Sequence, residues 1–115
     1  MKTSELTGAA LDWAVAKREF GVKHLRVNGG AVFLKNCDDL IPYHPSTDWA
    51  QGGPIIEREG ICFEFDVESE LFTAYFPTKQ GSAEGVGETH LIAAMRCYVA
   101  SKLGNEVDVP EELTP

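Results

Sequence analysis

The feature of the sequence that most constrains its fold is an alternation of apolar and polar residues between positions 61 and 77. Residues 61–67 place an apolar side chain at every second position, with acidic residues at most positions between them. Successive side chains of a β-strand point to opposite faces, so this period of two predicts a strand with an apolar row on the core and an acidic row in water. Residues 71–77 predict a second strand, and the short polar turn at 68–70 predicts that the two pair as a hairpin.

Two helices are predicted, one on each side of the strand-rich part of the chain. The segment 7–20 is rich in strong helix formers, with Thr7 placed to cap it and Gly21 to end it. Its apolar residues cover nearly the whole circumference, which predicts a largely enclosed helix. The second helix spans about 89–103, starts at a Thr89 cap and carries an apolar stripe of Ile92, Met95, Val99 and Leu103.

The segments between these elements give weaker signals. Residues 24–27 and 31–34 predict two short strands joined across an Asn28-Gly29 turn. Residues 35–54 hold many Pro, Gly and Asp residues and are expected to form a long irregular loop with a single helical turn near Trp49, capped by a hydroxyl at position 46 or 47. Residues 78–88 are rich in Gly and are expected to be a mobile loop.

The order helix, strands, helix predicts an α+β fold, with a small antiparallel sheet of three to five strands and two main helices packed on one face. A chain of 115 residues is too short for two domains that each bury a core. We expect a single domain over residues 1–104 and an acidic C-terminal tail over residues 105–115.

Composition argues against several classes of function. The formal net charge is −8, with 10 Lys and Arg residues against 18 Asp and Glu residues, whereas nucleic-acid binding draws most of its affinity from basic side chains. No apolar run approaches the roughly 20 residues that span a bilayer, and the first residues do not form a signal peptide.

The three cysteines, Cys37, Cys62 and Cys97, lie far apart and form no C-x-x-C pair. This spacing indicates neither a disulfide framework nor a zinc site, and the simplest interpretation is buried, reduced thiols in a cytoplasmic protein. No cofactor is predicted.

The stretch 43–59, YHPSTDWAQGGPIIERE, is the first candidate site. Trp49 offers a flat face for a base or another ring, Arg58 suits a phosphate or carboxylate, and the paired glycines let a ligand approach the main chain. The candidate ligand-binding or partner-binding residues are Tyr43, Ser46, Thr47, Asp48, Trp49, Gln51, Gly52, Gly53 and Arg58. The alternative is a structural loop whose tryptophan plugs the edge of the core, and the sequence leaves both open.

The second candidate surface is the acidic face of the first hairpin strand, formed by Glu64, Asp66 and Glu68. Such a row could face a basic partner, in which case salt would weaken binding steeply, or it could only be solvated.

No catalytic residue and no metal ligand set is predicted. His44 and Asp48 would share a helical face, but two ligands are too few for a metal and Pro45 lies between them. The run GSAEGVGETH fails as a phosphate-binding loop because Glu88 stands where lysine is needed. No local signature orients a Cys-His-Asp triad.

Three stretches carry a family resemblance: SELTGAALDWAVAK near the start, STDWAQGGPIIERE in the middle and LIAAMRCYVASKLGNEVDVPEEL at the end. Together they resemble the NinX-type family of small proteins from lambdoid phages and prophages of enteric bacteria. The resemblance implies a phage accessory protein that works in the cytoplasm of the bacterial host. It implies no activity and no role for any residue.

The sequence therefore favours a non-enzymatic protein that binds a host or phage protein, for takeover or counter-defence, through the acidic face or the 43–59 stretch. The alternative is a small-molecule pocket for a nucleotide-like ligand held by Trp49 and Arg58, and an enzyme ranks third. A homodimer, formed through a hairpin edge or the first helix, stays open.

Overall fold

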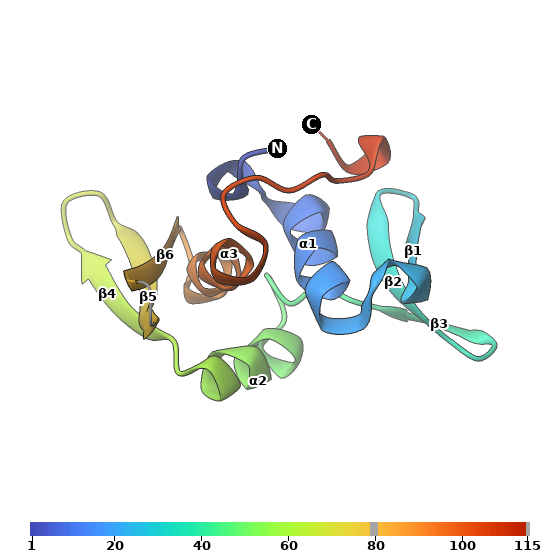
Figure 1. Cartoon of the computed structure of the whole chain (residues 1–115), viewed down its shortest axis with the longest axis horizontal. Helices are drawn as coiled ribbons and strands as arrows, with labels where there is room; N and C mark the ends of the chain where they lie inside the picture. Colours follow the sequence, from blue (N-terminus) through green and yellow to red (C-terminus); the bar gives the residue numbers. More distant parts are fainter. Residues whose placement is uncertain (79–80, 115) are drawn as a thin grey trace.

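The computed structural model, which describes residues 1–78 and 81–114, places three α-helices and two three-stranded antiparallel sheets (Figure 1). The helices are α1 (Gly8–Phe20), α2 (Trp49–Glu59) and α3 (His90–Leu103). The first sheet has the order β1 (Leu25–Asn28), β2 (Ala31–Asn36), β3 (Asp39–Pro42), and the second has the order β4 (Cys62–Asp66), β5 (Leu71–Thr78), β6 (Gly81–Gly87). The predicted α+β class is confirmed, with the strands divided between two sheets and with a third helix.

Helix α3 lies between the second sheet and α1, so it forms the centre of the molecule (Figure 1). Thr89 caps it as predicted, because its hydroxyl accepts a hydrogen bond from the N–H of Ile92 at 3.1 Å. Burial extends well beyond the predicted stripe. The buried residues of α3 are Leu91, Ala93, Ala94, Met95, Cys97, Tyr98 and Val99.

Strand β6 packs directly on α3 because two of its residues have no side chain. A Cβ atom built on Gly85 would collide with the backbone of Ala93 and Cys97, and one on Gly87 would lie 2.8 Å from the N atom of Ala93. Glycine is therefore required for the helix to approach the strand this closely.

This contact corrects the prediction of a mobile loop over residues 78–88. Residues 81–87 form β6, while residues 79 and 80 lie outside the described residues. The glycines that suggest a loop in the sequence serve instead to bring a helix against a strand.

Helix α1 is enclosed, as its apolar composition predicts, with every residue from Ala10 to Ala16 buried. It ends at Gly21, which adopts a φ of 90°. Thr7 occupies the N-cap position, but its side chain makes no capping hydrogen bond, so the predicted role of its hydroxyl is wrong.

The first sheet begins with the predicted hairpin, shifted by one residue at the turn. Asn28 pairs with Ala31, so the two turn residues are Gly29 and Gly30, both with positive φ. This is the conformation that a tight two-residue hairpin requires. Strand β3 adds a third strand inside the region expected to be irregular.

Helix α2 also forms where an irregular loop is predicted. Asp48, rather than Ser46 or Thr47, is its N-cap, and its carboxylate accepts a hydrogen bond from the N–H of Ala50 at 2.9 Å. The consecutive Gly52, Gly53 and Pro54 disfavour a helix by propensity. Tertiary contacts outweigh propensity here, as is usual for helices in folded proteins.

The hairpin of β4 and β5 is confirmed, with Phe63 opposite Ala74 and Phe65 opposite Phe72. Its apolar row faces the core only at its beginning. Ile61 is buried, whereas Phe65 is 52% exposed and Val67 is 77% exposed. The row therefore runs out of the core toward the turn.

The C-terminal segment lies along the surface beside the N-terminus (Figure 1). Val107 and Met1 exchange two backbone hydrogen bonds of 2.9 Å, and Val107 and Leu113 are buried. The predicted division between residues 1–104 and 105–115 stays a prediction.

Two further observations concern the cysteines and the membrane. Cys97 is buried, but Cys37 and Cys62 are exposed, so the prediction of buried thiols holds only for Cys97. None of the helices in the described part of the chain is long and apolar enough to cross a membrane.

Replacing Gly85 with alanine is expected to lower the free energy of unfolding by about 2 kcal/mol or more, because helix backbone cannot move aside for the new methyl group. The control is Gly53→Ala in α2, where the new Cβ makes only an ordinary contact with Trp49. The gain in helix propensity is opposed by crowding against Pro54, so a change of less than about 1 kcal/mol is expected. Urea unfolding of both variants checks this. Equal stability of Gly85→Ala and the parent protein would contradict the close packing of α3 on β6.

Candidate functional site

Trp49, the central residue of the predicted site, is displayed on the surface. It is the first residue of α2, and 56% of it is exposed. Its indole centroid lies 6.2 Å from the ring of His90, the first residue of α3. The N-termini of two helices therefore meet at this tryptophan.

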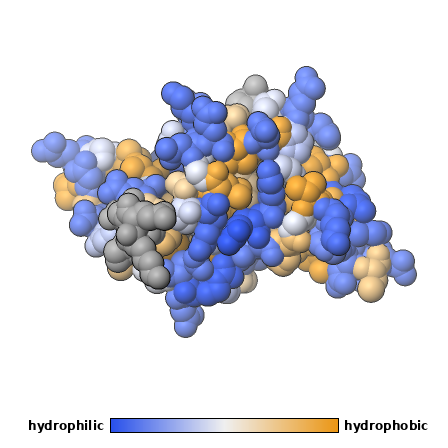
Figure 2. Space-filling model, in the orientation of Figure 1, coloured by the Kyte–Doolittle hydropathy of each residue, from blue (hydrophilic) through white to orange (hydrophobic). Residues whose placement is uncertain are grey.

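Five rings form a continuous aromatic row that starts at Trp49 and crosses the second sheet. The His90 ring lies 3.9 Å from that of Phe72 and 5.0 Å from that of Phe63. Phe72 in turn lies 4.9 Å from Phe65, centroid to centroid. Because Trp49 and Phe65 are both more than half exposed, the row is open to solvent at both ends. Figure 2 shows apolar surface beside hydrophilic residues at the end of the molecule where the second sheet lies.

A groove of about 440 Å³ runs along the Trp49 end of the row. Two hydroxyl residues of the segment before α2 form one wall, and the beginning of α3 forms the other. The groove is lined by Ser46, Thr47, Trp49, Phe72, Glu88, Thr89, His90, Leu91 and Ile92.

Ser46 lines this groove, but the residue is only 2% exposed and its Oγ is buried beside Asp12. Its backbone N–H donates to Oδ1 of Asp12 at 2.9 Å. Asp12 is itself buried in α1, and burial raises the pKa of its carboxyl. Asp12 thus fixes the wall of the groove to α1.

Two of the predicted polar residues organise the backbone. Asp48 caps α2. Gln51 accepts a hydrogen bond from the N–H of His44 at 2.6 Å and donates one to the carbonyl of Pro42 at 2.9 Å. Both side chains therefore hold the segment that precedes the helix.

Three other predicted residues belong to the packing around the groove. Tyr43 is buried and meets Phe20 edge to face, with ring centroids 5.3 Å apart. A Cβ atom on Gly52 would collide with the backbone carbonyl of Pro45, so glycine is needed for α2 to pack against the segment that precedes it. Gly53 packs against Trp49 at ordinary contact distance.

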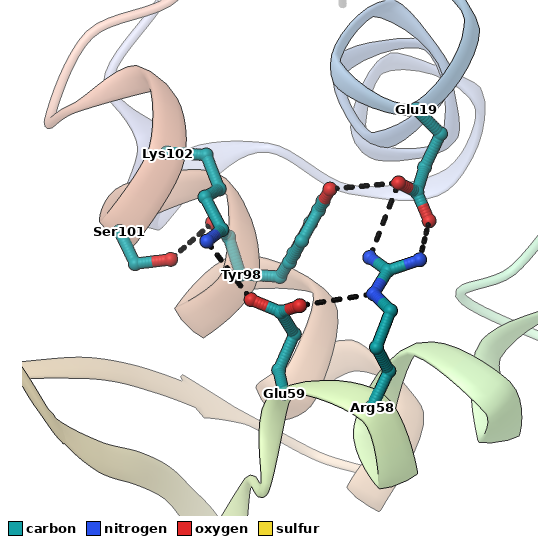
Figure 3. A network of polar contacts seen from close by, with 6 residues as sticks. All are labelled: Glu19, Arg58, Glu59, Tyr98, Ser101 and Lys102. Carbon is teal, nitrogen blue, oxygen red and sulfur yellow. Dashed lines mark hydrogen bonds and ion pairs between the residues drawn. The ribbon is translucent and has the colours of Figure 1, made fainter.

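Arg58 lies at the other end of α2, does not line the groove and takes part in an ion-pair network (Figure 3). Its two terminal nitrogens contact the carboxylate of Glu19 at 2.9 and 3.1 Å, and its Nε contacts Glu59 at 2.9 Å. Lys102 also pairs with Glu59 at 2.9 Å. The network therefore joins α2 to α1 and α3.

Tyr98 completes this network by donating its hydroxyl to Glu19 at 2.9 Å. Burial, together with this hydrogen bond to a carboxylate, raises the pKa of Tyr98 to about 12. Burial alone would raise the pKa of Glu59, but the hydrogen bonds from Lys102 and Arg58 outweigh it and lower that pKa. The guanidinium of Arg58 is thus committed to carboxylates of its own chain.

The acidic face lies across β4 from the aromatic row. Glu64, Asp66 and Glu68 are all exposed. Asp66 accepts hydrogen bonds from the Ser69 hydroxyl and from the N–H of Glu68, which lowers the pKa of its carboxyl. Because neighbouring side chains of a strand alternate, Glu64 and Asp66 point away from the face that carries the phenylalanines.

Three of the residues that line the groove, Ser46, Thr47 and Trp49, are predicted from the sequence as site residues, whereas the other half of the site is not. The sequence predicts core positions for the phenylalanines of β4 and β5, and it predicts the start of a helix at Glu88 and His90. The one usable signal is the length of the apolar row, which continues to Val67 next to the turn.

A larger cleft of about 520 Å³ lies elsewhere, near the N-terminus and β6. Arg96 lines this cleft, and its guanidinium donates hydrogen bonds to the carbonyls of Leu6 at 2.9 Å and Val86 at 2.7 Å. The side chain therefore links the segment before α1 to β6. Among the described residues, no group of three or more His, Cys, Asp or Glu is placed to hold a metal ion.

The fold and the site define a small α+β protein with an open aromatic row beside two helix N-termini. Comparison with protein families adds its origin. Residues 2–102 match the family described as Bacteriophage P22, NinX, so the chain belongs to this family of bacteriophage proteins. The resemblance seen in the sequence is thereby confirmed. A search of curated proteins finds no match to the chain.

The Asp12 carboxylate provides a pH-dependent test of the wall of the groove. Asp12→Asn keeps an acceptor for the Ser46 N–H and removes a buried charge, so we expect a thermal midpoint at pH 7 equal to or above that of the parent. Asp12→Ala leaves that N–H unpaired and is expected to cost about 1–3 kcal/mol.

The sign of the pH effect follows from the raised pKa of Asp12. The ionised carboxyl costs stability above its pKa in the folded state, and the cost vanishes below about pH 4, where both states are protonated. Any advantage of Asp12→Asn should therefore shrink as the pH falls. An advantage that grows on acidification would contradict this assignment.

Proposed function

We propose that this protein is a non-enzymatic phage accessory protein that acts in the cytoplasm of the infected cell by binding a protein partner from the host or the phage. Its binding surface is the aromatic row, and its role is takeover or counter-defence. The observation that carries the proposal is the continuity of the row, with Trp49 and Phe65 more than half exposed at its two ends.

The energetics of such a row favour a macromolecular partner. Soluble proteins rarely expose contiguous apolar surface without a use for it, and aromatic residues are enriched where proteins bind one another. Trp residues are among the side chains that most often dominate binding energy. A shallow groove leading into an open row suits an extended protein segment better than a fully enclosed small molecule.

The charge distribution defines the chemistry of the partner. The chain carries a formal net charge of −8, Glu88 lines the groove, and the acidic face lies on the opposite side of β4 from the row. We therefore expect a partner segment that combines apolar anchors with basic residues, because complementary charge speeds association and selects the partner.

A small-molecule ligand is the second candidate, favoured by a cavity of ordinary ligand size that aromatic and hydroxyl-bearing residues line. The nucleotide-like version is the weaker form. Arg58 is committed to Glu19 and Glu59, and Glu88 would repel a phosphate.

The proposal is tested by capture of partners from infected cells with tagged protein, followed by titration of the purified partner. The double variant Trp49→Ala, Phe65→Ala is expected to raise the Kd for the partner at least 30-fold. This factor corresponds to about 2 kcal/mol, the cost of removing a single dominant interface residue. Leu40→Ala, which removes a 44% exposed apolar side chain from the first sheet, is the matched control and should bind normally. Equal affinity of the double variant and the control would refute the proposal.

The acidic face should act mainly through long-range charge. Replacing Glu64 and Asp66 with lysine is expected to slow association at least tenfold in low salt, and the difference should narrow above about 0.5 M salt. Stopped-flow association with the purified partner measures this. An unchanged rate in low salt would mean that the face is only solvated.

A further inference from the structure

We infer that the groove beside Trp49 holds the guanidinium group of an arginine side chain of the partner. The inference rests on the proposed function and deepens it, since it names the residue that the partner places in the groove. Two features of the lining carry it: exposed aromatic rings and an exposed carboxylate.

The rings supply flat faces that attract a cation. Trp49, Phe72 and His90 all line the groove, and the indole is more than half exposed. A cation over an aromatic face is held by the ring quadrupole, and tryptophan binds it best. Guanidinium is planar and weakly hydrated, so it stacks on such a face more readily than an ammonium group does.

Glu88 supplies the opposite charge. It is exposed at the end of β6 and lines the groove, and in the described part of the chain the ion pairs of acidic residues are made by Glu19 and Glu59. Arg96, whose charge interacts with that of Glu88, directs its hydrogen bonds to two backbone carbonyls. The Glu88 carboxylate is therefore available to a partner.

The shape of the guanidinium suits both features at once. It carries five N–H donors at its edge, so it can pair with the Glu88 carboxylate while its flat face lies on an aromatic ring.

The competing occupants fit less well. A phosphate or carboxylate would meet Glu88 and a chain with a net charge of −8. The N-terminus of α3 favours negative charge, but its first turn is already capped by Thr89 and compensated by Glu88 just before the cap. A cation therefore has a local counter-charge that an anion does not have.

The test uses the full-length protein and two matched probes, Nα-acetyl-L-arginine N-methylamide and its citrulline counterpart, which has nearly the same shape without the charge. Two-dimensional NMR follows the indole N–H of Trp49, assigned with Trp49→Phe, and the backbone amides of His90 and Leu91. The arginine probe is expected to shift these signals saturably with a millimolar Kd, and the citrulline probe to bind at least tenfold more weakly.

Glu88→Gln should weaken arginine binding at least fivefold, while Glu84→Gln, the same change on an exposed β6 residue outside the groove, should leave it unchanged. Equal binding of the two probes, shifts confined to other residues, or no effect of Glu88→Gln would overturn the inference.

The two proposals fail separately. Loss of partner binding in the Trp49→Ala, Phe65→Ala variant with no arginine binding would leave the proposed function standing and remove the inference. Arginine binding together with an unaffected partner would leave a groove that binds guanidinium, but it would remove the aromatic row as the partner interface and the partner's arginine as the occupant.

Discussion

The structure depends on the direct contact between the backbone of β6 and the backbone of α3. Gly85 and Gly87 have no side chains, so α3 approaches the second sheet without an intervening layer. Three elements then pack around α3: the second sheet on one side, α1 on the other, and α2, which contacts both the beginning and the end of α3. A side chain at Gly85 would move the helix outward, and His90 would no longer rest against Phe72 at 3.9 Å.

The candidate site is a consequence of this arrangement and of two polar anchors. The Arg58 network fixes the end of α2 to α1 and α3, while the Asp12–Ser46 hydrogen bond fixes the segment before α2 to α1. Between these anchors, Trp49 is held against His90 with most of its indole in water. An exposed row of rings costs the isolated protein the burial energy that a core position would supply. Exposed apolar patches that contain tryptophan are typical of protein interfaces. Binding is therefore the function that the geometry supports best.

The sequence predicts helices and strands correctly where the apolar residues repeat with one clear period. It fails where a residue type such as glycine serves both in loops and in close packing between elements. The alternation in β4 and β5, the Ala-rich α1 and the Thr89 cap are local signals, and all three elements form as predicted. Gly85, Gly87, Gly52 and Gly53 carry the local signature of loops, but Gly85 and Gly87 serve close packing of β6 on α3 and Gly52 serves close packing of α2 on Pro45. These are contacts between different elements, which the local propensity of glycine does not encode. For Trp49 the sequence leaves open a displayed ring and a plug at the edge of the core, and the structure shows an exposed ring. Its neighbours Phe72 and His90 are not predicted as site residues, because proximity between a strand and the start of a helix is a tertiary property that no local pattern encodes.

The central claim is that α3 and β6 meet backbone to backbone, and nuclear Overhauser contacts in solution test it most directly. We predict strong contacts from the Gly85 Hα atoms to the amide of Cys97 and from the Gly87 Hα atoms to the amide of Ala93. Absence of these contacts, together with contacts from the same amides to a layer of side chains, would contradict the account.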